Sequence, residues 1–122
     1  MTVNASGLTE GNHGMHIHSA AVCDASIAFG SAGGHYNPFE KKHGLESAEG
    51  AHAGDMPNLP VGANGTGSLS YVNPRIRLTS GANSLFDADG SAIMIHAAAD
   101  DQVTDPQGNS AARIACGVIE RD

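Results

Sequence analysis

The sequence predicts an all-β domain of about six short strands joined by long loops. Short stretches alternate apolar and polar residues, which is the period of a strand with one buried face. Glycine occurs 16 times and aromatic residues make up only 4% of the chain, which favours turns and short strands over long amphipathic helices. A chain of 122 residues has the length of one domain, so we expect residues 1–122 to fold around a single modest core.

The first half of the chain contains two of the expected strands. Val3–Leu8 alternates weakly, and Gly14–Ala20 alternates more clearly, with two apolar side chains on one face and His16 and His18 on the other. From Ala21 to Gly54 no sustained period is present. A loop of this length is uncommon in a small domain unless something holds it, so we expect metal ions or a disulfide to fasten it.

The second half is expected to supply the remaining strands, which turns separate. Asn64-Gly65 is a hairpin signal, and Asp87–Gly90 is interpreted as a turn because it lacks the downstream glutamate of a calcium loop. The polar loop Asp100–Ser110 precedes the last strand. The strands are expected at Asp55–Val61, Gly67–Val72, Ala92–His96 and Arg113–Glu120.

Composition argues against several classes of function. The net charge is −7 with neutral histidines, which disfavours binding to the phosphates of nucleic acid. No apolar run approaches the roughly 20 residues that span a bilayer, so no membrane partner is expected. The N-terminus has neither a basic segment nor an apolar stretch, so we expect no signal peptide: the chain stays in the cytosol or has lost a leader.

Six histidines and one aspartate can be grouped into two metal sites. Residues two apart on a strand point the same way, so His16 and His18 can bind one ion, and His96 on another strand can complete that site. A second group offers three nitrogens and one oxygen, the ligand set of a closed tetrahedral zinc site. Its members are His35, His43, His52 and Asp55. His13 has no place in either group, and we expect it to face solvent.

Four segments of the chain closely resemble the copper/zinc superoxide dismutases, and the histidine loop is similar to that of the bacterial branch. The resemblance runs from about Val3 to the C-terminus, and the motifs occur in the family's order. It implies a Greek-key β-barrel or sandwich, which agrees with the all-β pattern. The matching segments are Gly14–His18, Ser31–Pro38, His52–Asp55 and Gly108–Ile119.

The resemblance implies an enzyme that converts superoxide into dioxygen and hydrogen peroxide by alternate reduction and reoxidation of copper. His35 would bridge copper to zinc through its two ring nitrogens and pass a proton to the peroxide. Copper would be bound by His16, His18, His35 and His96. Zinc would be bound by His35, His43, His52 and Asp55.

Four further residues take roles from the same resemblance. Asp100 would link a copper histidine to a zinc histidine, and Arg113 would attract and orient superoxide beside copper. Cys23 and Cys116 would form an intrachain disulfide that ties the irregular loop to the last strand. A disulfide implies the periplasm or the extracellular space, although the absence of a signal peptide leaves the cytoplasm open.

The chain departs from the family pattern in two ways. The family's barrel normally has eight strands and this chain begins at the third, so we expect exposed edges that a second copy or another polypeptide covers. Asp100–Ser110 contains three aspartates and no lysine or arginine, so we expect slower turnover that depends little on salt, unless Lys41 or Lys42 lies nearby.

These departures leave other functions open beside the enzyme. The first is a copper- and zinc-binding or metal-carrying module of the same fold with little turnover. A structural or assembly subunit is favoured least, because only the exposed edges support it.

Overall fold

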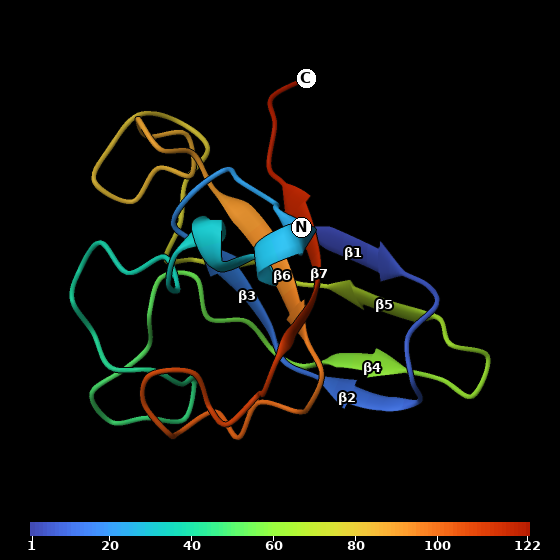
Figure 1. Ribbon diagram of the computed structural model, residues 1–122. Coiled ribbons are helices and arrows are strands. Elements are labelled where there is room, and N and C mark those ends of the chain that lie inside the picture. The colour runs from blue at the N-terminus through green and yellow to red at the C-terminus, as the bar shows by residue number, and fades with distance from the viewer.

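The computed structural model describes residues 1–122 as two small antiparallel sheets, so the predicted all-β fold is confirmed. The first sheet has the order β1-β5-β4-β2, and the second has the order β3-β6-β7. In Figure 1 the first sheet lies on the right and the long loops gather on the left. The strands are β1 (Thr2–Ala5), β2 (Gly11–His13), β3 (Met15–His18), β4 (Leu59–Val61), β5 (Gly67–Ser70), β6 (Ala92–His96) and β7 (Arg113–Val118).

Strand β3 is buried on both faces, which sets it at the centre of the molecule. Its apolar side chains, Met15 and Ile17, belong to the main core together with Leu59 and Val61 of β4. Burying a side chain of this size contributes about 1.5–3 kcal/mol. The opposite face carries His16 and His18, which are buried just as deeply beneath the long loops. The alternation in the sequence therefore separates a core face from a site face.

The register of the second sheet brings chemically active side chains together from distant parts of the chain. His16 lies opposite Met94 in the β3–β6 pair, and His96 lies opposite Arg113 in the β6–β7 pair. The register shifts between Ile95 and His96. Such an irregularity turns a side chain away from the regular alternation of the strand.

The stretch expected to lack a regular period has no named strand and contains only two short 3-10 helices, Ala25–Ile27 and Gly30–Ala32. Backbone hydrogen bonds fasten it to the centre, among them Tyr36 N–H to Ile17 O at 2.8 Å and Ile17 N–H to Gly54 O at 2.9 Å. The expected disulfide is also present, since Cys23 is bonded to Cys116 of β7.

The expectation that His13 faces solvent is wrong. The side chain is only 2% exposed, at the end of a short strand, β2, that was not predicted from the sequence. His13 Nδ1 lies 2.7 Å from the carbonyl oxygen of His96, and Nε2 lies 2.9 Å from that of Thr9. Burial is tolerated because both ring nitrogens have backbone partners. His96 is 83 residues away in the chain, so no local pattern could reveal this contact.

The terminal strands of the two sheets are β1 and β2 in the first and β3 and β7 in the second. Strand β3 is bridged on its outer side by His35 and Asp55. A groove of about 260 Å³ lies between β1 and β7, lined among others by Val3, Ile93 and Ala115. No helix of the structure combines the length and the apolar character needed to cross a membrane.

Candidate metal centre

Four histidine side chains converge beside the site face of β3. His16 and His18 project from β3, His96 ends β6, and His35 comes from the long loop, where its backbone bridges to His18. One ring nitrogen from each lies within 4.8 Å of the others. Two sheet strands and one fastened loop therefore deliver four nitrogens to one point.

Unpartnered ring nitrogens show that this group fits a metal ion. Leaving a buried polar group without a partner costs about 1–3 kcal/mol, so four such atoms in one place need an explanation. A metal ion at the point of convergence would satisfy them. The four atoms are His16 Nδ1, His18 Nε2, His35 Nε2 and His96 Nε2.

The other ring nitrogen of each strand histidine is held by the protein. His16 Nε2 lies 2.6 Å from Asp100 Oδ2, and His96 Nδ1 lies 3.0 Å from the carbonyl oxygen of Ala111. His18 Nδ1 lies 2.9 Å from the carbonyl oxygen of Gly33. Such contacts fix the orientation of a ring and would leave its free nitrogen available to a bound ion.

A second group surrounds one carboxylate oxygen on the far side of His35. Asp55 Oδ1 lies 3.1 Å from His35 Nδ1, 3.0 Å from His43 Nδ1 and 3.3 Å from His52 Nδ1. Ligands about 2.0–2.1 Å from a tetrahedral zinc ion lie about 3.3 Å from one another. The spacing of these four atoms therefore fits a closed zinc site, and His35 presents one nitrogen to each group.

His16 also lies within 4.8 Å of His35, His43 and Asp55. The reason is that its ring stacks on that of His35, with 3.9 Å between centroids. Both nitrogens of His16 are committed elsewhere, one to Asp100 and one to the first group. His52, whose Nδ1 is 3.2 Å from His35 Nδ1, is therefore the better fourth member of the second group.

Hydrogen bonds keep the two buried carboxylates of the centre ionised. Burial alone would raise the pKa of Asp55, but hydrogen bonds from the three histidines and from the Gly44 N–H hold it far below its usual value. Burial opposes ionisation of Asp100 in the same way, and its bonds to His16 and His43 lower its pKa. Negative charge thus faces both groups of imidazoles, which favours cations there.

Asp100 connects the two groups. Its Oδ2 contacts His16, and its Oδ1 lies 2.9 Å from His43 Nε2. The polar loop passes so close at Gly108 that a side-chain Cβ there would overlap the Asp100 carboxylate. Gly108 also has φ of +62°, so both space and backbone conformation require glycine.

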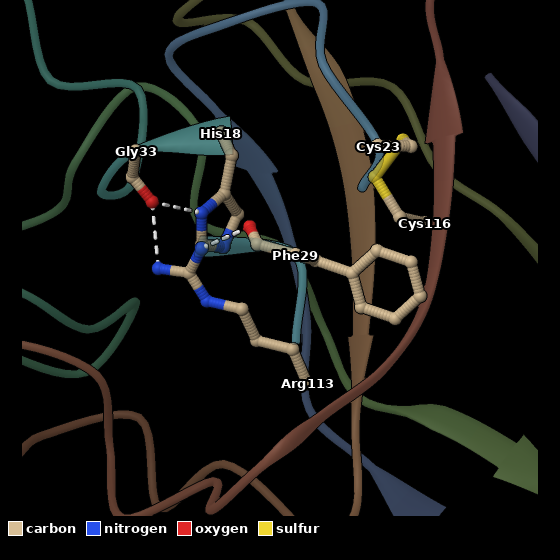
Figure 2. The surroundings of a disulfide bond; sticks show 6 residues. All are labelled: His18, Cys23, Phe29, Gly33, Arg113 and Cys116. Atoms are coloured by element: carbon tan, nitrogen blue, oxygen red, sulfur yellow. Dashed lines mark hydrogen bonds between the residues drawn. A yellow bond between two sulfur atoms is a disulfide. The ribbon is translucent and has the colours of Figure 1, made fainter. Parts of the chain in front are cut away.

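Arg113 lies next to the first group and is hydrogen-bonded to the long loop that Cys23 joins to β7 (Figure 2). Its Nη1 donates to the carbonyl oxygen of Phe29 at 2.7 Å, and its Nη2 donates to that of Gly33 at 2.6 Å. The Gly33 oxygen also contacts His18 Nδ1, so the guanidinium and a member of the first group share one anchor. Burial lowers the pKa of Arg113, but a guanidinium stays charged at neutral pH.

Comparison with known proteins assigns the family. The sequence pattern of the copper/zinc superoxide dismutases matches residues 1–119. The chain belongs to this family. The resemblance inferred from the sequence is therefore confirmed, and the family's metals, copper and zinc, suit the imidazole and carboxylate groups described above.

Two curated relatives come from Aquifex aeolicus (strain VF5). Superoxide dismutase (Cu-Zn) 1 is 49% identical over 106 residues, which are 86% of this chain and 62% of that protein. Superoxide dismutase (Cu-Zn) 2 is 46% identical over 119 residues, which are 96% of this chain and 69% of that protein. The crystal structure of a SOD-like protein from Bacillus subtilis has a TM-score of 0.91 at 43% identity, covering 96% of this chain and 78% of its own. The chain thus spans about two thirds of the length of its curated relatives.

Two side chains that order the dismutase-like site were missed by the sequence analysis. Asp105 Oδ1 accepts the N–H of His43 at 2.8 Å. Gln102 donates from Nε2 to Met56 O at 3.1 Å and accepts from Leu45 N–H at 3.3 Å. Both belong to the polar loop, whose only sequence signal was its acidity. Their partners are backbone groups, which leave no trace in a sequence.

Zinc binding to the metal-free protein is expected to release about one proton at about pH 7.5. Burial lowers the pKa of His35, the histidine shared by the two groups, so its ring is neutral there. Burial also opposes protonation of His43, but its bonds to Asp100 and Asp55 raise its pKa to about 9. A zinc ion that takes His43 Nδ1 must displace that proton, so zinc affinity should rise with pH up to about 9. Calorimetry in buffers of different ionisation enthalpy measures the release, and no release at that pH would contradict the assignment.

Proposed function

We propose that this chain dismutes superoxide, with copper held by one histidine group and zinc by the other. The observation that carries the proposal is the convergence of unpartnered, buried imidazole nitrogens beside the anchored guanidinium of Arg113. The copper ligands are His16, His18, His35 and His96. The zinc ligands are His35, His43, His52 and Asp55.

Copper supplies the one-electron acceptor and donor through which superoxide becomes dioxygen and hydrogen peroxide. The protein supplies the positive charge that brings the anion to it. Two donors of Arg113 are engaged by backbone carbonyls, so the guanidinium is fixed while its remaining N–H groups are free to bind superoxide. A charge fixed in advance needs no reorganisation when the substrate arrives.

His35 is placed to move a proton. Its Nε2 faces the copper group and has no protein partner, while its Nδ1 is held among His52 and Asp55. When Nε2 is not ligating, it can hold a proton and deliver it to the departing peroxide. The ring would stay in place during this exchange, because Nδ1 lies among the side chains that would hold zinc, 3.2 Å from His52 Nδ1 and 3.1 Å from Asp55 Oδ1.

The test is the rate of superoxide loss as the zinc-loaded protein is titrated with copper. We expect the rate to rise in proportion to bound copper up to one ion per chain. Full copper binding with negligible rate would instead favour the metal-binding or metal-carrying module. That alternative has support from a relative named only as a superoxide dismutase-like protein, which is 44% identical over 119 residues.

Turnover is expected to depend weakly on salt. Lys42 pairs with Asp105 of the polar loop, with 3.7 Å between Nζ and Oδ2, so a carboxylate partly offsets its charge. On a chain of charge −7, attraction by Arg113 and repulsion by the acids are screened together. Stopped-flow measurements from low to physiological salt should show less than about a threefold fall in kcat/KM. A steep fall would show that other cations steer the substrate.

The unpaired edges of β1 and β7 lead us to expect association of two copies, or cover by another polypeptide. Light scattering should find a species larger than the monomer at micromolar concentration, and a stable monomer would contradict this. The disulfide supports a working place in the periplasm or outside the cell, where such bonds persist.

A further inference from the structure

The turn His52–Asp55 carries two of the proposed zinc ligands, so its backbone shape fixes their spacing. On its inner side, Asp55 Oδ2 accepts the N–H of Gly44 at 2.8 Å and the N–H of His52 at 2.9 Å. These bonds direct the other oxygen, Oδ1, towards the three histidine rings. Asp55, itself a proposed zinc ligand, therefore holds the inner side of the turn in place.

The outer side of the turn is held by one arginine, Arg75, from the segment that follows β5. Its Nε donates to the carbonyl oxygen of His52 at 3.2 Å, and its Nη2 donates to that of Asp55 at 2.7 Å. One rigid guanidinium therefore spans the first and last residues of the turn. A planar fork of this kind fixes the separation of its two acceptors, which a flexible ammonium group cannot do.

Arg75 is itself anchored for this task. Its backbone N–H donates to Asn73 Oδ1 at 3.0 Å, and its carbonyl oxygen accepts from Asn83 Nδ2 at 2.9 Å. Asn73 Nδ2 adds a further bond to the same turn, at 2.8 Å from the carbonyl oxygen of Ala53. The half-buried guanidinium forms no ion pair with a carboxylate. Its two shorter contacts go to the carbonyl oxygens of the turn, and a longer one, at 3.5 Å, goes to the hydroxyl of Tyr71.

We propose that Arg75 is a positioning residue for zinc, which sets the distance between His52 Nδ1 and Asp55 Oδ1 by clamping the two carbonyl oxygens of the turn. The inference rests on the proposed assignment of the second group to zinc. It adds a residue that touches no ligand atom and that no motif of the sequence marked.

The test compares Arg75→Ala and Arg75→Lys with a matched control, Arg77→Ala. Arg77 lies two residues further along, its side chain is exposed, and its hydrogen bonds are those of its backbone. Zinc dissociation constants are measured by competition with a chromophoric chelator, and cobalt(II) placed in the zinc site reports its geometry through visible absorption. Copper binding to the first group serves as the internal reference.

We expect Arg75→Ala to raise the zinc dissociation constant about 10- to 100-fold, the usual effect of losing a partner behind a ligand. Arg75→Lys should fall between, because one ammonium reaches only one of the two oxygens. The tetrahedral cobalt(II) absorption should weaken in both variants, while copper binding stays unchanged. The control Arg77→Ala should match the unmodified protein throughout.

Zinc binding and cobalt(II) spectra unchanged in Arg75→Lys and Arg75→Ala would overturn the inference. Equal loss of zinc and copper would overturn it too, since Arg75 would then support the whole fold. If Arg75→Ala does not fold, Arg75→Lys decides alone: an unchanged zinc constant rejects the clamp, and a raised one with copper intact supports it. If the unmodified protein gives no tetrahedral cobalt(II) spectrum, the zinc assignment fails first, and the inference fails with it.

Discussion

Replacing Arg113 by alanine is expected to lower kcat/KM for superoxide about 10- to 100-fold while copper and zinc stay bound. A hydrogen bond to a charged partner is worth about 1.5–3 kcal/mol. Losing that much stabilisation of the transition state lowers a rate by about 10- to 100-fold. The metals should stay bound because the hydrogen bonds of the Arg113 side chain go to the carbonyl oxygens of Phe29 and Gly33 and not to the histidine nitrogens that would bind copper. Metal content by atomic absorption and initial rates by stopped flow separate the two effects.

Two variants sharpen this experiment. Arg113→Lys keeps the charge but cannot hold both carbonyl oxygens, so we expect part of the rate to return. Arg121→Ala removes an exposed arginine that stacks on Phe86, and it should leave the rate unchanged. A full rate in Arg113→Ala at equal copper content would contradict the role of Arg113 and favour a metal carrier.

Removing the disulfide is expected to lower the stability of the protein more than any of the other substitutions. Cys23 and Cys116 are 93 residues apart, and closing such a loop is worth about 4–5 kcal/mol in the chain-entropy treatment. The double variant Cys23→Ser/Cys116→Ser should therefore unfold at much lower urea concentration in the metal-free state. A loss below about 1 kcal/mol would show that the loop is held by other contacts.

The disulfide variant should also lose activity through Arg113. Phe29, which accepts from the guanidinium, lies in the loop that Cys23 ties to β7 (Figure 2). Once this loop is released, the guanidinium loses a fixed acceptor, and the rate per bound copper should fall towards that of Arg113→Ala. Combining the two changes should then lower the rate little further, because both act on the same group.

Much of the fold could be predicted because strand periodicity is a local property. Ala92–His96 was predicted with the bounds that the structure has, and the alternation of Gly14–Ala20 separated the core face of β3 from its site face. Strand β2 was missed because Gly11–His13 is too short to show a period. His13 was misplaced for a related reason: its partners are backbone oxygens brought near by folding.

The sequence could predict the ligand side chains of the site but not the backbone groups that orient them. The histidines and Asp55 stand in short motifs of a recognisable type, and the structure brings them into two adjoining groups around His35. Asp100 was found because it is a side chain, but the groups behind His18 and His96 are backbone carbonyls, which every residue carries. Arg75 and Gln102 therefore gave no signal, although each contacts the backbone that holds the site.

We propose that His35 would lie between a copper ion and a zinc ion, with one ring nitrogen directed to each. Anomalous diffraction from crystals loaded with both metals, recorded at the copper and zinc absorption edges, can locate the two ions separately. We expect one copper peak among His16, His18, His35 and His96, and one zinc peak among His35, His43, His52 and Asp55. A single metal peak, or a peak on only one side of His35 after full loading, would contradict it.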